Sequence, residues 1–249
     1  MKAMVLAAGL GTRLRPLTND RPKALVEVAG RTLLEITLTR LRKFGVRDVI
    51  INVHHFAEMI ERYLQTHNNF GMHIEVSRED DLLLDTGGGL KRAGWFFQSA
   101  TGREEPFVLH NVDVISGIDL KRMFKFHDNM TALSTLAVQH RETSRYLLFD
   151  ESLQLCGRES GKDGTRDLVR NVAHPQPLAF SGIHIISPRL IPMMTEQGSF
   201  SIIDSYLRLA RGGEKIQGFA ADDYYWRDLG RPEHISQAEN DIAKGLISI

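Results

Sequence analysis

Glycine and cationic side chains follow directly on the first apolar run of the chain. The run Ala3–Ala8 is continuously apolar, and Gly9, Gly11, Arg13 and Arg15 come immediately after it. A continuous apolar run that glycine interrupts predicts a strand covered on both faces. Ligands of open α/β sheets bind beyond the carboxyl ends of such strands, where glycine lets backbone N–H groups approach phosphate oxygens. Because arginine offers a cationic fork that matches phosphate, these residues predict a phosphate-binding loop.

Two well-known phosphate-binding loops fit this segment poorly. A Walker A loop needs Gly-Lys-Ser/Thr at its end, and Gly11-Thr12-Arg13 stands here instead. A dinucleotide fingerprint would have a small residue where Leu14 stands, and its helix would begin at once, whereas Pro16 and Pro22 keep the segment irregular. A Rossmann-type oxidoreductase is therefore disfavoured.

The elements that must position this loop alternate along the first half of the chain. Apolar periodicity predicts strands and helices in turn up to about residue 140, which indicates an α/β fold with a mixed, mostly parallel sheet and helices on both faces. Thr32 and Glu35 form a capping box for one helix, and another short helix is expected to follow Gly87–Gly89. Later segments predict a hairpin over 146–156 and a loop over 162–176. We expect a single domain over residues 1–249, because no linker or repeat interrupts it.

Composition narrows the class of protein. The chain has 249 residues, with 31 Lys+Arg balanced by 31 Asp+Glu, so bulk charge does not favour a nucleic-acid or membrane partner. Cys156 is the single cysteine, which fits a reducing compartment and predicts a small apolar side chain in a strand. We expect neither a signal peptide nor a membrane span, and therefore a cytoplasmic protein.

The stretch Leu6–Gly30, LAAGLGTRLRPLTNDRPKALVEVAG, resembles the signature of the sugar-1-phosphate nucleotidylyltransferases. That signature reads roughly L-A-A-G-x-G-T-R-L-x-P-L-T, a short gap, then P-K-x-L-x-x-V-x-G. Further landmarks extend the resemblance over nearly the whole chain, at Gly87–Gly89, Asn111–Asp113, Phe180–Gly182 and Trp226–Gly230. The resemblance implies a Rossmann-like fold of the nucleotide-diphospho-sugar transferase type. It also implies a reaction in which an NTP and a sugar 1-phosphate give an NDP-sugar and pyrophosphate.

The resemblance assigns roles to individual residues. Arg13 and Lys23 would be catalytic, because they stabilise the charge that grows on pyrophosphate. Asp113 and Asp228 would hold Mg²⁺, the implied cofactor. Residues 1–140 would form a nucleotide-binding half and residues 141–249 a sugar-binding half. The residues implied for nucleotide binding are Leu6, Ala8, Gly9, Gly11, Thr12, Arg13, Lys23, Thr86, Gly87 and Gly88, and those implied for the sugar phosphate are Asn111, Arg145, Ser181 and Gly182.

The assignment of Arg145 is a choice among four arginines. Larger relatives carry a Glu-Lys-Pro motif in this region, which this chain lacks, so the phosphate clamp must come from elsewhere. The candidates are Arg141, Arg145, Arg166 and Arg170, of which we favour Arg145.

Length and the Thr-Gly-Gly-Gly segment resemble the short uridylyltransferases that act on N-acetylmuramate 1-phosphate in cell-wall recycling. UTP is therefore the favoured nucleotide. Guanylyltransferases for mannose or heptose 1-phosphate share the signature and remain an alternative, as does a catalytically silent regulatory relative. Val112 stands where many relatives carry glycine, which leaves the sugar open. The expected partners are an NTP and a sugar 1-phosphate, with no prediction of oligomeric state.

Overall fold

The computed structural model describes residues 1–98 and 105–249. Its strands are β1 Lys2–Leu6, β2 Glu27–Val28, β3 Arg31–Thr32, β4 Asp48–Val53, β5 His73–Arg78, β6 Phe107–Asn111, β7 Val114–Ser116, β8 Ser134–Gln139, β9 Arg145–Phe149, β10 Leu155–Ser160, β11 Arg166–Leu168, β12 Gln176–Ile186, β13 Ile216–Ala220 and β14 Trp226–Asp228. Its helices are α1 Leu33–Lys43, α2 Ala57–Thr66, α3 Asp85–Arg92, α4 Leu120–Met130, α5 Leu190–Met193, α6 Ile202–Arg211 and α7 Pro232–Ala243, with short 3-10 turns η1 Thr12–Leu14, η2 Lys23–Leu25, η3 Asn68–Gly71 and η4 Ala93–Phe97. Within the described ranges, none of these helices has both the length and the apolar character needed to cross a bilayer.

A ten-stranded sheet organises the described residues, in the order β11-β10-β9-β12-β6-β1-β4-β5, with β8 and β13 branching from β12. Strand β1 lies between β4 and β6 and runs parallel to both, and β5 continues the parallel part beyond β4. The long strand β12 pairs antiparallel with β6, β8 and β9, so the second half of the chain joins the sheet in mixed orientation. The parallel strands place several carboxyl ends along one edge.

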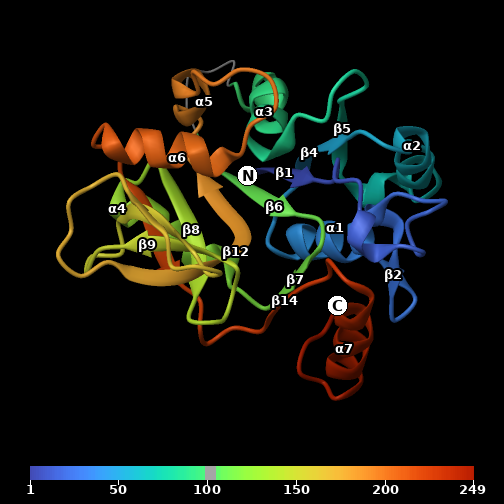
Figure 1. Cartoon of the computed structure of the whole chain (residues 1–249). Helices are drawn as coiled ribbons and strands as arrows, with labels where there is room; N and C mark the ends of the chain where they lie inside the picture. The colour runs from blue at the N-terminus through green and yellow to red at the C-terminus, as the bar shows by residue number, and fades with distance from the viewer. Residues whose placement is uncertain (99–104) are drawn as a thin grey trace.

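Hydrophobic cores lie on both faces of the sheet. Ala3 and Val5 of β1 face a core with helices α1, α2 and α4, whereas Met4 between them faces a second core with α3 and α6. Figure 1 shows α3 and α6 over one side of the sheet and α1 on the other. This alternation explains why β1 is continuously apolar from Ala3 to Leu6, as the sequence predicted. The expected α/β architecture with helices on both faces is confirmed.

Several elements differ from their predicted form. Strand β1 ends at Leu6 rather than Ala8, and residues 166–168 of the expected loop form the edge strand β11. Gly87–Gly89 lie inside α3 instead of preceding it. The short strands β7 and β14, which no pattern predicted, pair with each other.

Candidate active site

A cavity of about 330 Å³ opens at the carboxyl end of β1. Its walls come from β1 and the residues after it, from the ends of β4 and β6, and from the segment that starts α3. Because β1, β4 and β6 are parallel, these ends meet at one edge of the sheet. The residues predicted from the sequence that line it are Leu6, Ala8, Gly9, Lys23, Thr86, Asn111 and Asp113.

The two predicted metal ligands lie at the adjoining ends of two paired strands, Asp113 just before β7 and Asp228 as the last residue of β14. Strand β14 pairs with β7 so that Asp228 stands opposite Val114, directly after Asp113. The backbone N–H of Leu229 donates to the carbonyl of Asp113 at 2.7 Å. The pairing of β7 with β14 therefore brings together two acidic residues that are far apart in the sequence.

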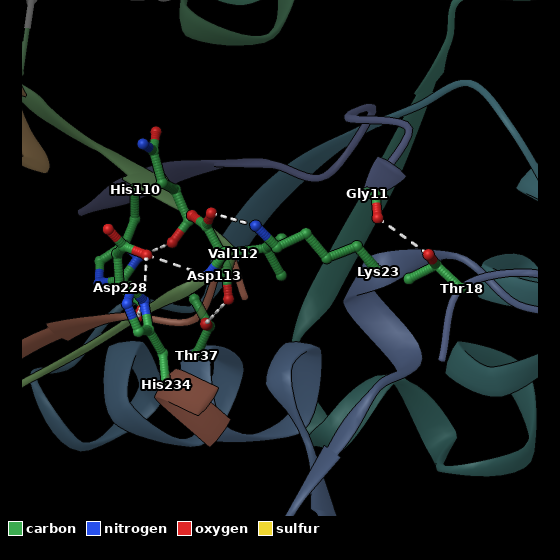
Figure 2. Close-up of polar contacts among 11 residues, drawn as sticks. Gly11, Thr18, Lys23, Thr37, His110, Val112, Asp113, Asp228 and His234 are labelled. Atoms are coloured by element: carbon green, nitrogen blue, oxygen red, sulfur yellow. Dashed lines mark hydrogen bonds and ion pairs between the residues drawn. The ribbon is translucent and has the colours of Figure 1, made fainter. Parts of the chain in front are cut away.

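Lys23 forms an ion pair with Asp113 at the cavity. Turn η2 places the lysine, whose residue is only 8% exposed, and its Nζ donates to Oδ2 of Asp113. Figure 2 shows the lysine side chain extending toward this carboxylate. A buried ammonium needs such a partner because desolvation is costly. The lysine and the aspartate, predicted for separate roles, thus contact each other directly.

Asp228 is held in a fixed orientation by two donors. Its Oδ1 accepts from the N–H of Gly230 at 2.9 Å and from Nδ1 of His234 at 3.1 Å. His234 Nδ1 also lies 3.0 Å from the carbonyl of Asp228, and since both partners are acceptors, this nitrogen carries the proton. Burial alone would raise the pKa of Asp228, but the Gly230 amide, His234 and Lys23 together lower it. The carboxylate is thereby favoured in its charged form.

Sequence reasoning missed His234. The residue lies in the first turn of α7, six positions after the aspartate it contacts, and Figure 2 shows it beside Asp228. Nothing in the pattern separated it from the other nine histidines of the chain. Its role becomes visible only when α7 packs against the end of β14.

Arg13 reaches the same place from the glycine-rich loop. A Cβ built on Gly230 would lie 2.9 Å from Nη2 of Arg13 and 3.1 Å from Oδ1 of Asp228. The Arg13 guanidinium is therefore adjacent to the Gly230 turn and to the Asp228 carboxylate. Thr12 and Arg15 are exposed on either side of it. Of the two arginines in the loop, Arg13 is the one beside the acidic pair.

The three glycines of the Thr86–Gly89 segment serve close packing in this structure. A Cβ at Gly87 would lie 2.4 Å from the Phe200 ring, and one at Gly88 would lie 2.5 Å from the carbonyl of Gly198. Thr86 lines the cavity, and its Oγ1 accepts from the N–H of Ile202. All three glycines are buried in α3, where the resemblance implied that Gly87 and Gly88 bind the nucleotide.

The residues predicted for the sugar phosphate divide into two groups. Asn111 and Gly182 are in contact, because Gly182 has φ +73° and a Cβ there would lie 2.9 Å from Nδ2 of Asn111. Ser181 precedes Gly182 on the same strand and is buried, and its carbonyl accepts from the indole N–H of Trp226 at 2.7 Å. Arg145 is exposed at the start of β9, whereas Arg141 packs on Trp226.

The two aspartates offer a donor set that suits Mg²⁺. Among the described residues, no protein group donates to Oδ1 of Asp113 or to Oδ2 of Asp228, so each carboxylate keeps one oxygen for a ligand. No larger cluster of His, Cys, Asp or Glu arranged for a metal occurs in residues 1–98 and 105–249. Mg²⁺ binds through one or two carboxylates and completes its shell with substrate phosphates and water. The residues present fit such an ion.

Comparison with known proteins identifies the family of the chain. Residues 2–150, more than half of the chain, match the family described as Nucleotidyl transferase. The N-acetylmuramate alpha-1-phosphate uridylyltransferase of Caulobacter vibrioides is 35% identical over 97% of this chain and 97% of its own length. The D-glycero-alpha-D-manno-heptose 1-phosphate guanylyltransferase of Aneurinibacillus thermoaerophilus is 28% identical over 97% of this chain and 98% of its own.

A solved structure shares the fold. The crystal structure of HddC from Yersinia pseudotuberculosis complexed with GMP-PN has a TM-score of 0.74 to this chain at 21% sequence identity. The match covers 97% of this chain and 99% of that one. The Rossmann-like fold expected from the sequence is thereby confirmed.

Proposed function

The chain belongs to the nucleotidyl transferase family and is a sugar-1-phosphate nucleotidyltransferase; from this premise we propose that it transfers UMP from UTP to N-acetylmuramate 1-phosphate. The observation that carries the proposal is the meeting of Lys23, Arg13, Asp113 and Asp228 beside one cavity at the end of β1. The uridylyltransferase of Caulobacter vibrioides, similar over nearly the full length of both proteins, supports the choice of substrates. Cell-wall recycling in the cytoplasm is the setting we infer.

The main requirement of the reaction is to neutralise and orient the negatively charged phosphates, because the nucleophile needs no activation. An oxygen of the sugar's phosphate attacks the α-phosphorus of the NTP, and the bond from that phosphorus to pyrophosphate breaks. The second pKa of a phosphate monoester lies near 6, so the nucleophile is already ionised at neutral pH. The obstacle is that two anions must meet, and the protein must supply positive charge and orientation.

Asp113 and Asp228 would hold Mg²⁺ through the oxygens that no protein donor occupies. The bound ion would neutralise phosphate charge and orient the reacting groups. The Gly230 amide and His234 fix one oxygen of Asp228, which leaves the other oriented for the ion. Such outer contacts set the orientation and basicity of a ligating carboxylate.

Lys23 and Arg13 would carry the charge that grows on the leaving pyrophosphate. Lys23 lines the cavity, and Arg13 lies at the Gly230 turn, so both cations flank the acidic pair. Gly9 and Gly11 would contribute backbone N–H groups to the phosphates, because neither places a side chain between backbone and ligand. Thr12 would contribute its own N–H in the same way.

We assign nucleotide binding to residues 1–140 and sugar binding to residues 141–249, within one domain. Leu6, Ala8 and Thr86 line the cavity and would contact the nucleoside, with Gly87 and Gly88 behind Thr86. The contact between Gly182 and Asn111 supports a sugar site on the other side of the acidic pair, next to Ser181. The heptose guanylyltransferase that is similar over the full chain makes GTP with heptose 1-phosphate the second candidate pair.

A matrix of four NTPs against a panel of sugar 1-phosphates tests the proposal, with pyrophosphate release as the readout. We expect the highest turnover with UTP and N-acetylmuramate 1-phosphate, and dependence on added Mg²⁺. Highest turnover with GTP and heptose 1-phosphate would replace the proposed substrates by the second pair. Absence of pyrophosphate release with every pair would identify a regulatory relative instead.

Asp113→Asn tests the acidic pair without unfolding the chain. Asparagine keeps an oxygen that can accept from the buried Lys23 but lacks the charge that holds a divalent ion. We expect turnover to be abolished and the melting temperature to stay close to that of the wild type. The exposed Asp223 supplies the control, Asp223→Asn, whose turnover should not change. Near-normal turnover of Asp113→Asn with Mg²⁺ would refute the metal assignment.

A further inference from the structure

Arg141 is a partly buried arginine whose hydrogen-bonding capacity is mostly unused. It follows β8, and its Nη2 donates to the carbonyl of Phe180 at 2.6 Å. Its Nε is fully buried and has no hydrogen-bond partner among the described residues. Nη1 likewise donates to no described residue. A buried unsatisfied donor is costly, so it indicates a missing acceptor.

The guanidinium is held in place by aromatic stacking. Its Cζ lies 3.7 Å from the centre of the Trp226 ring, within the range of a cation–π contact. Trp226 is itself fixed, because its indole N–H donates to the carbonyl of Ser181. The guanidinium of Arg141 is therefore held in one orientation before a ligand binds, which lowers the entropy cost of binding.

This position is next to the acidic pair. Trp226 and Asp228 are two residues apart on β14, so their side chains share one face and their Cα atoms lie about 7 Å apart. Burial lowers the pKa of Arg141, and the nearby Asp228 partly offsets that effect. A phosphate that reaches a metal ion on Asp228 is thus within reach of Arg141.

We propose that Arg141 binds the phosphate of the sugar 1-phosphate and orients its attacking oxygen. The inference rests on the proposed function and adds a third cation near the acidic pair. Its anchors, Phe180 and Trp226, flank the Ser181-Gly182 segment, whereas Arg13 and Lys23 come from the loop after β1. A planar fork matches phosphate better than a point charge does.

Steady-state kinetics of Arg141→Gln and Arg141→Lys test the assignment. Hydrogen bonds to charged groups are strong enough that we expect the KM for the sugar 1-phosphate to rise about 10- to 100-fold in Arg141→Gln. The KM for the NTP should stay within about threefold. Arg62→Gln, at an exposed position of α2, is the matched control and should leave both KM values unchanged. Arg145→Gln tests the rival clamp, an exposed arginine at the start of β9.

Trp226 supplies a readout that is independent of turnover. The chain has two tryptophans, so Trp95→Phe leaves Trp226 as the single tryptophan reporter. We expect inorganic phosphate and the sugar 1-phosphate to change its fluorescence, and Arg141→Lys to weaken that response with little change in melting temperature. A role confined to covering Trp226 would instead lower the melting temperature and leave the phosphate response intact.

Three results would overturn the assignment. These are an unchanged KM for the sugar 1-phosphate in Arg141→Gln, an equal rise in Arg145→Gln, and a rise confined to the NTP. Failure of the proposed function is seen separately, because wild-type protein would then release no pyrophosphate with any substrate pair. An Arg141-dependent response of Trp226 to inorganic phosphate would in that case still establish the anion site.

Discussion

Gly230→Ala should displace Arg13 and lower the turnover rate while leaving the stability of the fold nearly unchanged. Gly230 does not adopt the left-handed backbone conformation, so alanine is allowed there and only the added methyl group matters. That methyl would lie 2.9 Å from Nη2 of Arg13 and 3.1 Å from Oδ1 of Asp228. Ordinary contacts begin at 3.4 Å, so the two charged groups must move by a few tenths of an ångström.

The size of the rate loss depends on whether Arg13 or Asp228 moves to accommodate the methyl group. Arg13 is exposed and flexible, whereas Asp228 is held by the Gly230 amide and His234, so the guanidinium should move by about 0.5 Å. Misplacing a catalytic group by 1 Å can cost about 10²-fold in rate, and half that displacement corresponds to about tenfold. The free energy of unfolding should change by less than about 1 kcal/mol, because the displaced arginine is at the surface.

The assay is pyrophosphate release under saturating substrates, with thermal unfolding measured on the same samples. Gly117→Ala is the matched control, since a Cβ there meets Tyr225 and Ile247 at no less than 3.7 Å. Arg13→Ala alone should lose about 10²–10³-fold in rate, as removal of an oxyanion donor does, and adding Gly230→Ala should then cost less than tenfold. Wild-type turnover of Gly230→Ala, or full additivity with Arg13→Ala, would refute the coupling between this turn and the arginine.

Two further predictions concern stability. Gly89→Ala should lower the free energy of unfolding by about 1–3 kcal/mol in urea denaturation, because its Cβ would lie 2.7 Å from Oε1 of the buried Glu79 and 2.8 Å from Nδ2 of Asn52, whereas Gly117→Ala should not. Burial lowers the pKa of His127 from 6.5 to about 4, so the unfolded chain takes up the proton first and stability should fall as pH drops from about 6.5 to 4. His127→Gln should flatten this part of the profile of melting temperature against pH, and an unchanged slope would mean that the histidine is solvated.

The glycine-rich loop after β1, for which we propose phosphate binding, could be recognised from local sequence, because its chemistry and its backbone requirement lie within one short stretch. Gly11 has φ +63°, and the apolar run before it is the central strand β1. The two aspartates, in contrast, could not be assigned from local sequence. Asp113 and Asp228 were assigned only through resemblance, since β7 and β14 have three residues each and are too short to show a period.

Residues oriented by tertiary packing could not be predicted from the chain alone. Arg141 and Arg145 occupy the same polar stretch, and only the packing of Trp226 from the distant strand β14 distinguishes them. The run of glycines indicated a turn before a helix, yet it lies within α3. Glycine is unfavourable inside helices, but a Cβ at Gly88 would lie 2.5 Å from a carbonyl oxygen, and this close approach outweighs the helix propensity.

The signature after β1 specifies many residues within a short stretch, and the way the loop folds back on itself gives a physical reason. A Cβ at Gly11 would lie 3.0 Å from Cγ2 of Thr18 and 3.1 Å from Cβ of Lys23, so the residue must be small as well as left-handed. Thr18 closes the loop by donating from Oγ1 to the carbonyl of Gly11 at 2.9 Å. Because Lys23 must also reach Asp113, the number of residues between Gly11 and Lys23 cannot change without moving the ammonium. Spacing in this stretch is thus set by three contacts at once, which is why a local pattern could indicate a phosphate site before any strand pairing was known.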